Sequence, residues 1–212
     1  MSGEVWFISG IDTGIGKTAA TGWLAVKLAC NGASVITQKM VQTGCQDESE
    51  DIVVHRRIQK IELIEDDKNG ITCPYLFDYP CSPHLAAKMS GQTIDWHKIN
   101  QATAELAVKY DYVLLEGAGG LAVPLNDTQT TLDFVAQQGY PVVLVTSGRL
   151  GSINHTLLSL MACRQYDIEV KYLIYNRFGE KDELIERDTA AYLQHYLQQN
   201  FAQTRFEWMD EV

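Results

Sequence analysis

Short, wholly apolar runs alternate with longer amphipathic stretches along this chain, and that alternation most restricts the folds open to it. The apolar runs predict strands at 5–9, 34–38, 71–77, 112–115, 141–146 and 169–175. The amphipathic stretches predict helices at 16–31, 51–63, 82–89, 94–110, 132–138, 152–166 and 181–199. Strands that are apolar throughout are buried on both faces, so helices must cover both sides of a parallel sheet. The sequence therefore predicts one α/β domain over residues 1–212.

Charge and composition exclude several classes of function. The 212 residues include 17 Lys and Arg against 27 Asp and Glu, a formal charge of −10, and 46% are hydrophobic. An acidic globular protein lacks the basic face that a nucleic-acid polymer requires, so we expect no nucleic-acid partner. No apolar run approaches the roughly 18 residues of a membrane-spanning helix, and residues 1–10 lack the basic region of a signal peptide, so we expect no membrane contact. Five widely spaced cysteines without a CxxC pair favour reduced thiols and a cytoplasmic location over a zinc site.

Residues 10–18 read GIDTGIGKT and lie between the first predicted strand and the first predicted helix. This context is typical of a loop that binds nucleotide phosphates, with backbone N–H groups and the helix dipole directed at the ligand. The strict pattern GxxxxGK[ST] is missed because Ile11 stands where its first glycine belongs. We expect Lys17 to reach the β- and γ-phosphates of a bound polyphosphate and the Thr18 hydroxyl to bind Mg²⁺. The predicted nucleotide-binding residues of the loop are Gly14, Ile15, Gly16, Lys17, Thr18 and Ala19.

Two carboxylates could complete a magnesium site. Glu116 closes the predicted strand at 112–115, where an acidic residue can reach a metal at the edge of the sheet. Asp51 opens the second helix and is the candidate for the other carboxylate, with Asp47 and Glu50 as close rivals. Together with the Thr18 hydroxyl, these groups offer the oxygen ligands that Mg²⁺ prefers. The turn after Glu116 is small enough to approach phosphate, and its predicted nucleotide-binding residues are Gly117, Ala118 and Gly119.

Lys39 and a series of short motifs are further candidates for functional residues outside the loop at 10–18. Lys39 ends the second predicted strand, at the edge where parallel sheets bind ligands. The motifs are GIDTGIGKT at 10–18, KMVQTG at 39–44, SPH at 82–84, EGAGG at 116–120 and LGSINH at 150–155, followed by Asn176 at a strand end. In this order they resemble the dethiobiotin synthetase family, whose patterns are GTDTxxGKT, KP(V/I)xxG, SPH, EGAGG and LGxINH. The resemblance spans most of the chain and implies a P-loop NTPase-like fold.

The resemblance implies ATP-dependent carboxylation and ring closure of 7,8-diaminononanoate with CO₂ from bicarbonate, the penultimate step of biotin synthesis. One amine would capture CO₂ as a carbamate, and the carbamate oxygen would attack the γ-phosphate to give a carbamic-phosphoric anhydride. The second amine would then close the ring of dethiobiotin. Mg²⁺ is the implied cofactor, and a homodimer with its substrate site at the interface is the implied assembly.

Residue roles follow from the same resemblance. Lys39 and Lys17 would be catalytic, and Asn176 and Arg177 would bind the nucleotide. The implied substrate-binding residues are Thr43 at the diamine end and Leu150, Gly151, Ser152, Ile153 and Asn154 at the carboxylate end. The family's GxIP segment, which helps to enclose the purine, has no counterpart after Arg177, and this favours a relaxed preference for the base.

Other classes of function remain open at this point. A partitioning or septum-site ATPase, a dimerising switch, has a related loop but carries a lysine where Asp12 stands here. A catalytically silent domain of the same fold would have lost Lys17, Thr18 or Glu116, and all three are present. An amidoligase would bring a glutaminase domain, for which 212 residues leave no room.

Overall fold

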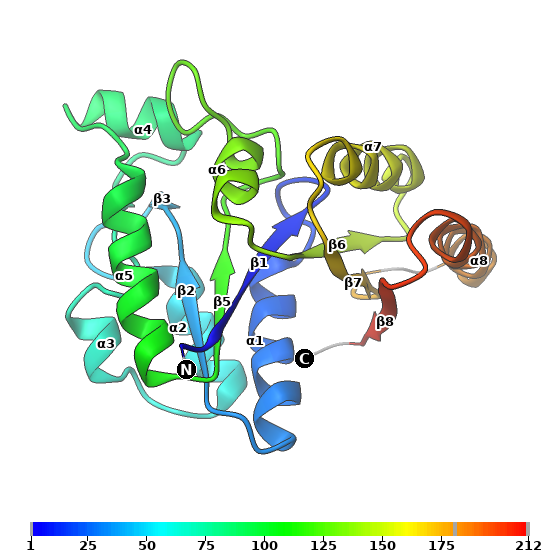
Figure 1. Ribbon diagram of the computed structural model, residues 1–212, viewed down its shortest axis with the longest axis horizontal. Helices are drawn as coiled ribbons and strands as arrows, with labels where there is room; N and C mark the ends of the chain where they lie inside the picture. Colours follow the sequence, from blue (N-terminus) through cyan, green and yellow to red (C-terminus); the bar gives the residue numbers. More distant parts are fainter. Residues whose placement is uncertain (1, 180–181, 211–212) are drawn as a thin grey trace.

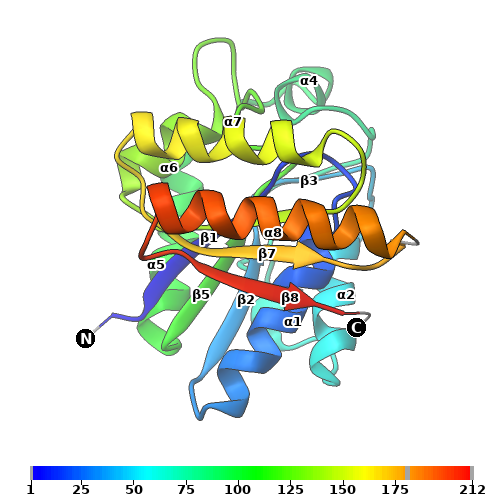
Figure 2. The same cartoon turned by 90° about the vertical axis from the view of Figure 1, so that its right-hand side faces the viewer.

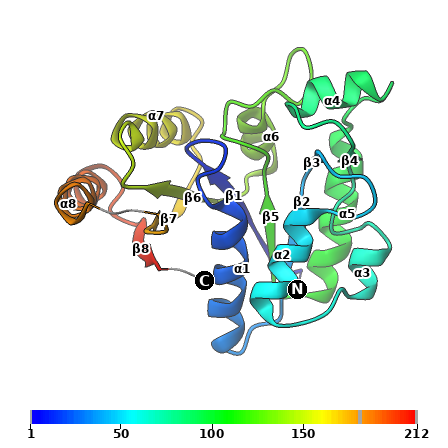
Figure 3. The same ribbon diagram turned by 180° about the vertical axis from the view of Figure 1, so that it is seen from behind.

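Six parallel strands form the main sheet of the computed structural model, which describes residues 2–179 and 182–210. Their order across the sheet is β2-β5-β1-β6-β7-β8, and each neighbouring pair is parallel. In chain order the elements are β1 (Glu4–Gly10), α1 (Lys17–Cys30), β2 (Val35–Lys39), β3 (Gln42–Thr43), α2 (Glu50–Gln59), α3 (Glu65–Lys68), β4 (Leu76–Phe77), α4 (Pro83–Met89), α5 (Trp96–Lys109), β5 (Tyr112–Glu116), α6 (Thr131–Gln138), β6 (Val142–Ser147), α7 (Ser152–Gln165), β7 (Val170–Asn176), α8 (Glu183–Asn200) and β8 (Arg205–Met209). Figure 1 shows α5 and α6 in front of the sheet, and Figure 3 shows α1 and α2 on its other side. The predicted α/β parallel sheet with helices on both faces is confirmed.

The register of the sheet sets the geometry of the site. In the β2–β5 pair Lys39 lies opposite Glu116, and in the β1–β5 pair Ile8 lies opposite Glu116. The carboxyl ends of these strands therefore meet at one edge, together with the end of β6. The loops that leave this edge carry the motifs singled out above, as expected for a parallel α/β sheet.

The predicted strand at 71–77 is mostly wrong. Only its last two residues form a strand, β4, which pairs with β3 in a separate small sheet. The first two amides of the segment donate to the carbonyl of Asp66 at 3.1 and 3.4 Å, and Pro74 has no N–H to offer a neighbour. These local bonds take the backbone donors that a ladder would need.

The predicted helix at 51–63 also differs, because α2 ends at Gln59. Lys60 follows in the left-handed conformation with φ of 58°, and its N–H caps the helix; the short helix α3 is a separate element. At the other end the Ser49 hydroxyl accepts a hydrogen bond from the Ile52 N–H at 3.3 Å, which places Asp51 in the first turn. The predicted start of the helix at 181–199 lies outside the described residues, and the described part, α8, begins at Glu183.

The sequence patterns did not reveal β8, the edge strand. Its residues alternate charged and aromatic side chains, and only Met209 among them is buried. Figure 2 shows β8 beside β7, with α7 and α8 running alongside. The Trp208 and Phe206 rings lie 5.0 and 5.9 Å from the Tyr175 ring, and these contacts hold the strand in place. Because β8 ends at the same edge as β7, it delivers Met209 and Asp210 beside the phosphate loop.

None of the helices that the structure describes is long and apolar enough to cross a membrane.

Candidate nucleotide and metal site

The loop between β1 and α1 is built for close approach of a ligand to backbone. Gly14 and Gly16 have φ of +70° and +96°, a conformation that favours glycine. A Cβ on Gly16 would come within 2.3 Å of the Asn176 amide nitrogen, which donates to the Ile15 carbonyl at 2.9 Å. Asn176 thus holds the loop against the end of β7. Gly16 also offers no capping side chain to α1, so the first N–H groups of the helix remain available for an anion.

The displaced first glycine of the motif has a steric explanation. A Cβ on Gly10 would come within 2.4 Å of Cγ2 of Ile15, which folds back over it. Ile11, one residue later, is 8% exposed and packs into the core. The glycine is therefore needed at position 10, and an apolar side chain is accommodated where the strict pattern has glycine.

Lys17 points back onto its own loop. Its ammonium donates to the Asp12 carbonyl at 3.0 Å, and the side chain is almost fully buried. Burial lowers the pKa of Lys17 to about 8, and the charge of Glu116 only partly opposes the effect. An anion bound to the loop would supply the counter-charge that this ammonium lacks.

Four predicted residues from four separate elements meet at the end of β5. The Thr18 hydroxyl lies 2.9 Å from Oδ1 of Asp51 and 3.3 Å from Oε1 of Glu116. The Lys39 ammonium lies 2.5 Å from Oδ2 of Asp51 and 2.9 Å from Oε1 of Glu116. It also donates to the Gly117 carbonyl at 3.1 Å. The structure thus brings Asp51 to Thr18 and Glu116, whereas the rivals Asp47 and Glu50 are exposed to solvent.

The charges at this centre stabilise one another. Burial would raise the pKa of Glu116, but the charge of Lys39 and the hydrogen bond from His55 hold it far below its usual range. Burial would lower the pKa of Lys39, but the charges of Glu116 and Asp51 raise it above its ordinary value. Glu116 is therefore a carboxylate and Lys39 an ammonium at neutral pH.

Two residues of this centre were missed from the sequence. The Thr21 hydroxyl and the His55 Nε2 atom lie 2.9 and 2.8 Å from Oε2 of Glu116. Thr21 stands three residues after Thr18 on α1, and His55 stands four residues after Asp51 on α2. That helical spacing puts each of them on the same face as a predicted ligand, and it was the only sequence signal available.

The donor set fits Mg²⁺. The hydroxyl of Thr18 and one oxygen each of Asp51 and Glu116 converge, and the Lys39 ammonium already occupies the space between the two carboxylates as a cation. Among the residues that the structure describes, no group of three or more His, Cys, Asp or Glu could hold a metal ion alone. Mg²⁺ retains water and phosphate ligands, so a partial protein shell of oxygen donors suits it.

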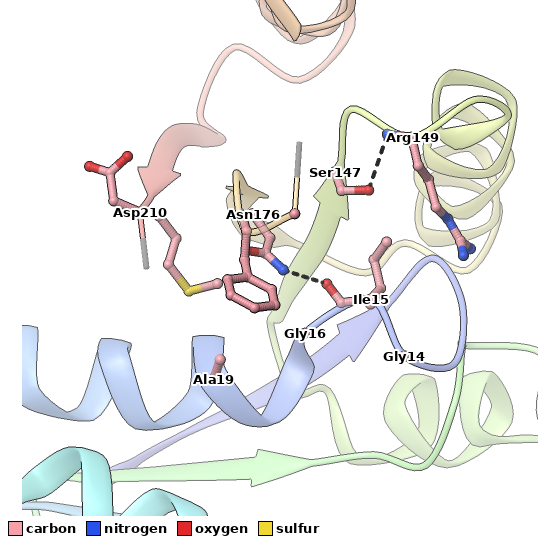
Figure 4. Close-up of a pocket in the computed structure, with 11 residues that line it drawn as sticks. Gly14, Ile15, Gly16, Ala19, Ser147, Arg149, Asn176 and Asp210 are labelled. Carbon is pink, nitrogen blue, oxygen red and sulfur yellow. Dashed lines mark hydrogen bonds between the residues drawn. The ribbon is translucent and has the colours of Figure 1, made fainter. Parts of the chain in front are cut away.

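Two cavities flank the loop and share Gly14 and Gly16. The first, of about 400 Å³, is lined by Thr13, Lys17, Thr18, Lys39, Thr43, Asp51, Glu116, Ala118 and Gly119, among others. The second, of about 500 Å³, is lined by Ile15, Ala19, Ser147, Arg149, Asn176, Phe178, Met209 and Asp210, among others (Figure 4). The first holds Lys17, Lys39, Asp51 and Glu116, and the second has more apolar walls despite Arg149 and Asp210. Their arrangement suits a nucleotide whose phosphates lie in the first cavity and whose nucleoside lies in the second.

The structure separates other predicted residues from these cavities. The Arg177 guanidinium pairs with Glu186 and Asp210 and lies 5.4 Å from the Trp208 ring, and it lines neither cavity. The segment 150–154 also lines neither of them, and Leu150 is fully exposed. The residue before that segment reaches the loop, where Arg149 forms an ion pair with Asp12 and holds the pKa of that carboxyl below its usual value.

A glycine-rich loop after the first strand, an open helix start behind it and an acidic strand end define a P-loop nucleotide-binding fold. Solved structures of this class share the fold at low identity. A ParA family ATPase from Chlorobium tepidum has a TM-score of 0.57 and 15% identity, covering 99% of this chain and 85% of that chain. A chain of the MinC:MinD cell division protein complex from Aquifex aeolicus has a TM-score of 0.57 and 18% identity, covering 99% and 82%.

Sequence comparison narrows the class. Residues 4–204 match the family model described as "AAA domain". The ATP-dependent dethiobiotin synthetase BioD 2 of Pasteurella multocida is 60% identical, covering 99% of this chain and 98% of that protein. The protein of the same name from Haemophilus ducreyi is 61% identical over 98% and 99%, and the BioD of Chlorobaculum tepidum is 53% identical over 92% and 84%. The chain belongs to the dethiobiotin synthetase family.

Proposed function

We propose that this chain is an ATP-dependent cyclo-ligase that converts 7,8-diaminononanoate and CO₂ to dethiobiotin, with release of ADP and phosphate. The observation that carries the proposal is the first cavity, where Lys17, Lys39 and a metal-type oxygen set face one space. Thr43 lines the same space, so a second substrate can lie beside the terminal phosphate. An ATPase that acts only as a switch needs no space for a second substrate beside the terminal phosphate.

The proposed reaction has three steps. One amine of the substrate attacks CO₂ and loses a proton, which gives a carbamate. A carbamate oxygen then attacks the γ-phosphorus while the bond to the ADP oxygen breaks, which gives the mixed anhydride. The second amine attacks the carbonyl carbon, loses a proton and expels phosphate as the ring closes. Phosphoryl transfer of this kind needs positioning and charge neutralisation more than covalent help from the protein.

The residues of the first cavity supply that neutralisation. Lys17 would bind the β- and γ-phosphate oxygens, and Lys39 would stand between the carbamate and the γ-phosphate as a permanent ammonium. Thr18, Asp51 and Glu116 would hold Mg²⁺, which offsets phosphate charge when bound. Thr43 would contact the diamine end.

The second cavity would hold the nucleoside. Asn176 shapes it by fixing the loop, and β8 supplies the wall for which the sequence offered no counterpart. Met209 and Asp210 face the cavity in place of the family's GxIP segment. The relaxed preference for the base stays a prediction.

We also propose a homodimer. The turn before α7 exposes Leu150, and the helix itself exposes Leu158 and Met161, an apolar set that a second copy would cover. In that arrangement the segment 150–154, which lines neither cavity of its own chain, would face the substrate bound in the other copy. Its amides at the start of α7 lack a capping side chain and suit a carboxylate. Sedimentation equilibrium would show a dimer, and a monomer at micromolar concentration would refute this assembly.

The alternative of a dimerising ATPase switch has less support. Asp12 occupies the position of that class's signature lysine, and its carboxylate is paired with Arg149 of the same chain. An acidic, internally paired side chain cannot reach a second nucleotide as a lysine would.

The test of the proposed function is phosphate release measured with and without diaminononanoate and bicarbonate. We expect release to require both. Lys39→Gln should lower kcat by about 10²- to 10³-fold while nucleotide affinity changes little, because Lys39 stabilises charge that develops in the transition state. Lys27→Gln, at the far end of α1, is the matched control and should behave as the unaltered protein. Phosphate release without the diamine, or none with it, would defeat the synthetase proposal.

A further inference from the structure

His55 contacts Glu116 on the side away from Lys39 and Thr18. Its side chain, on α2, is fully buried. The Nε2 atom lies 2.8 Å from Oε2 of Glu116, and the buried Nδ1 atom has no hydrogen-bond partner among the described residues. A buried histidine with one satisfied nitrogen is unusual, because unpaired polar atoms are costly in a protein interior. Among the described residues, the hydrogen bond to Glu116 is the only one that the ring makes.

The direction of that hydrogen bond is determined by its partner. Glu116 is ionised and its oxygens only accept hydrogen bonds, so the His55 proton must sit on Nε2. The other donor to Oε2 is the Thr21 hydroxyl, which also lies 2.8 Å from the Lys17 carbonyl. A hydroxyl carries one proton, so Thr21 must share it between these two acceptors. His55 is the donor that serves Oε2 without competition.

The two oxygens of Glu116 consequently have different surroundings. Oε2 is turned toward His55 and Thr21, below the cavity, whereas Oε1 faces Thr18 and Lys39, which line it. The terminal torsion of a glutamate is broad and roughly two-fold, so nothing in the residue itself selects this orientation. The contacts on both oxygens select it, and those on Oε2 come from His55 and Thr21.

We propose that His55 is a positioning residue for the metal site: its Nε2–H holds Oε2 of Glu116 so that Oε1 stays directed at the metal beside Thr18 and Asp51. The inference rests on the proposed role of Glu116 as a magnesium ligand. His55 would not bind the metal itself and would act on it only through Glu116. Such outer supports contribute about 10- to 100-fold to metal affinity in other sites.

The experiment measures Mn²⁺ binding by electron paramagnetic resonance, with a non-hydrolysable ATP analogue present and no turnover. His55→Asn, whose shorter amide cannot reach Glu116, should weaken Mn²⁺ binding by about tenfold or more. His55→Gln, whose amide N–H can take the place of Nε2–H, should bind within about threefold of the unaltered protein. In the reaction, His55→Asn should raise the Mg²⁺ concentration for half-maximal rate, with kcat at saturating Mg²⁺ nearly unchanged.

Two further variants distinguish a loss of α2 packing, an error in the role of His55 and an error in the role of Glu116. Ile58→Ala removes packing between α2 and α1 without touching Glu116, because the Ile58 side chain lies where a Cβ on Gly22 would meet it. It should leave Mn²⁺ affinity unchanged, and a loss equal to that of His55→Asn would show that loosening of α2 is the cause and overturn the inference. Equal affinities of the Asn and Gln variants would overturn it as well. Glu116→Gln tests the underlying assignment: if it binds Mn²⁺ as tightly as the unaltered protein, the proposed metal role of Glu116 is wrong. If Glu116→Gln loses affinity and His55→Asn does not, only the role of His55 fails.

Discussion

Replacing Lys17 by methionine should stabilise the ligand-free protein. The Lys17 side chain is 7% exposed, and burial lowers its pKa from 10.5 to about 8. Each pKa unit corresponds to about 1.4 kcal/mol, so holding the charged form in the folded protein costs about 3 kcal/mol at pH 7. Methionine has nearly the same length and carries no charge, so Lys17→Met removes this cost.

One favourable interaction is lost with the charge. The Lys17 ammonium donates to the Asp12 carbonyl at 3.0 Å, and a hydrogen bond from a charged group contributes about 1 kcal/mol or slightly more. The desolvation cost is larger than this loss. We therefore expect Lys17→Met to raise the free energy of unfolding by about 2 kcal/mol at pH 7.

The pH dependence of the stability difference shows whether the buried charge of Lys17 is its cause. Between pH 8 and 10.5 the unfolded chain keeps the Lys17 proton while the folded chain has released it, so this group makes the unaltered protein more stable as pH rises. The advantage of Lys17→Met should accordingly shrink across this range and vanish near pH 10. Taking the difference between the two proteins cancels the titration of the buried cysteines and tyrosines, which they share.

Urea unfolding at pH 7, 9 and 10, without nucleotide and with EDTA, measures this difference. The same variant should lose affinity for a triphosphate, which separates stability from function. A methionine variant that is less stable than the unaltered protein at pH 7, or an advantage independent of pH, would refute the reasoning.

Two other substitutions test the packing around the site. Arg56→Met removes the cation and two of the hydrogen bonds, of 2.8 and 2.7 Å, from the buried Asp67 carboxylate, which keeps those from the Ile64 N–H and the Thr72 hydroxyl. We expect a loss of about 3–5 kcal/mol and a Tm lower by about 10 °C in thermal circular dichroism, and a drop of less than about 3 °C would contradict this. Gly16→Ala adds strain at φ of +96° and a contact 2.3 Å from the Asn176 amide, so it should lower stability by about 2–3 kcal/mol in urea unfolding and weaken nucleotide binding. Gly14→Ala, where the added Cβ meets nothing within 4 Å, is the control and should lose only about 1 kcal/mol; equal losses would rule out the contact as the cause.

The sequence predicted site residues best where a residue type suited to the chemistry also stood at the end of a predicted strand or the start of a predicted helix. Lys17, Thr18, Lys39 and Glu116 each adjoin a strand or helix boundary that the apolar pattern marks, and parallel strands bring such boundaries to one edge. Asp51 could not be separated from its acidic neighbours, because that choice depends on where the Ser49 cap starts α2. Position along the chain alone does not contain that information.

Other features depend on partners that are distant in sequence. The helical spacing of His55 from Asp51 places both on one face of α2, but it does not identify Glu116, 61 residues away, as the partner of His55. Arg177 directly follows a strand end and still turns to Glu186 and Trp208, because those side chains lie beside it in the folded protein. β8 was missed because an edge strand exposes most of its side chains and so lacks a continuous apolar run.

The position of the Lys39 ammonium between Asp51 and Glu116 makes cation binding an exchange. Lys17, Lys39, Asp51 and Glu116 together carry two positive and two negative charges, so these four side chains already balance one another. A bare divalent cation would add uncompensated positive charge there and would compete with the ammonium for the same oxygens. A triphosphate with the cation already bound still carries net negative charge, which Lys17 on the phosphate loop attracts. We therefore expect metal and nucleotide to bind as one complex, and free metal alone to bind weakly.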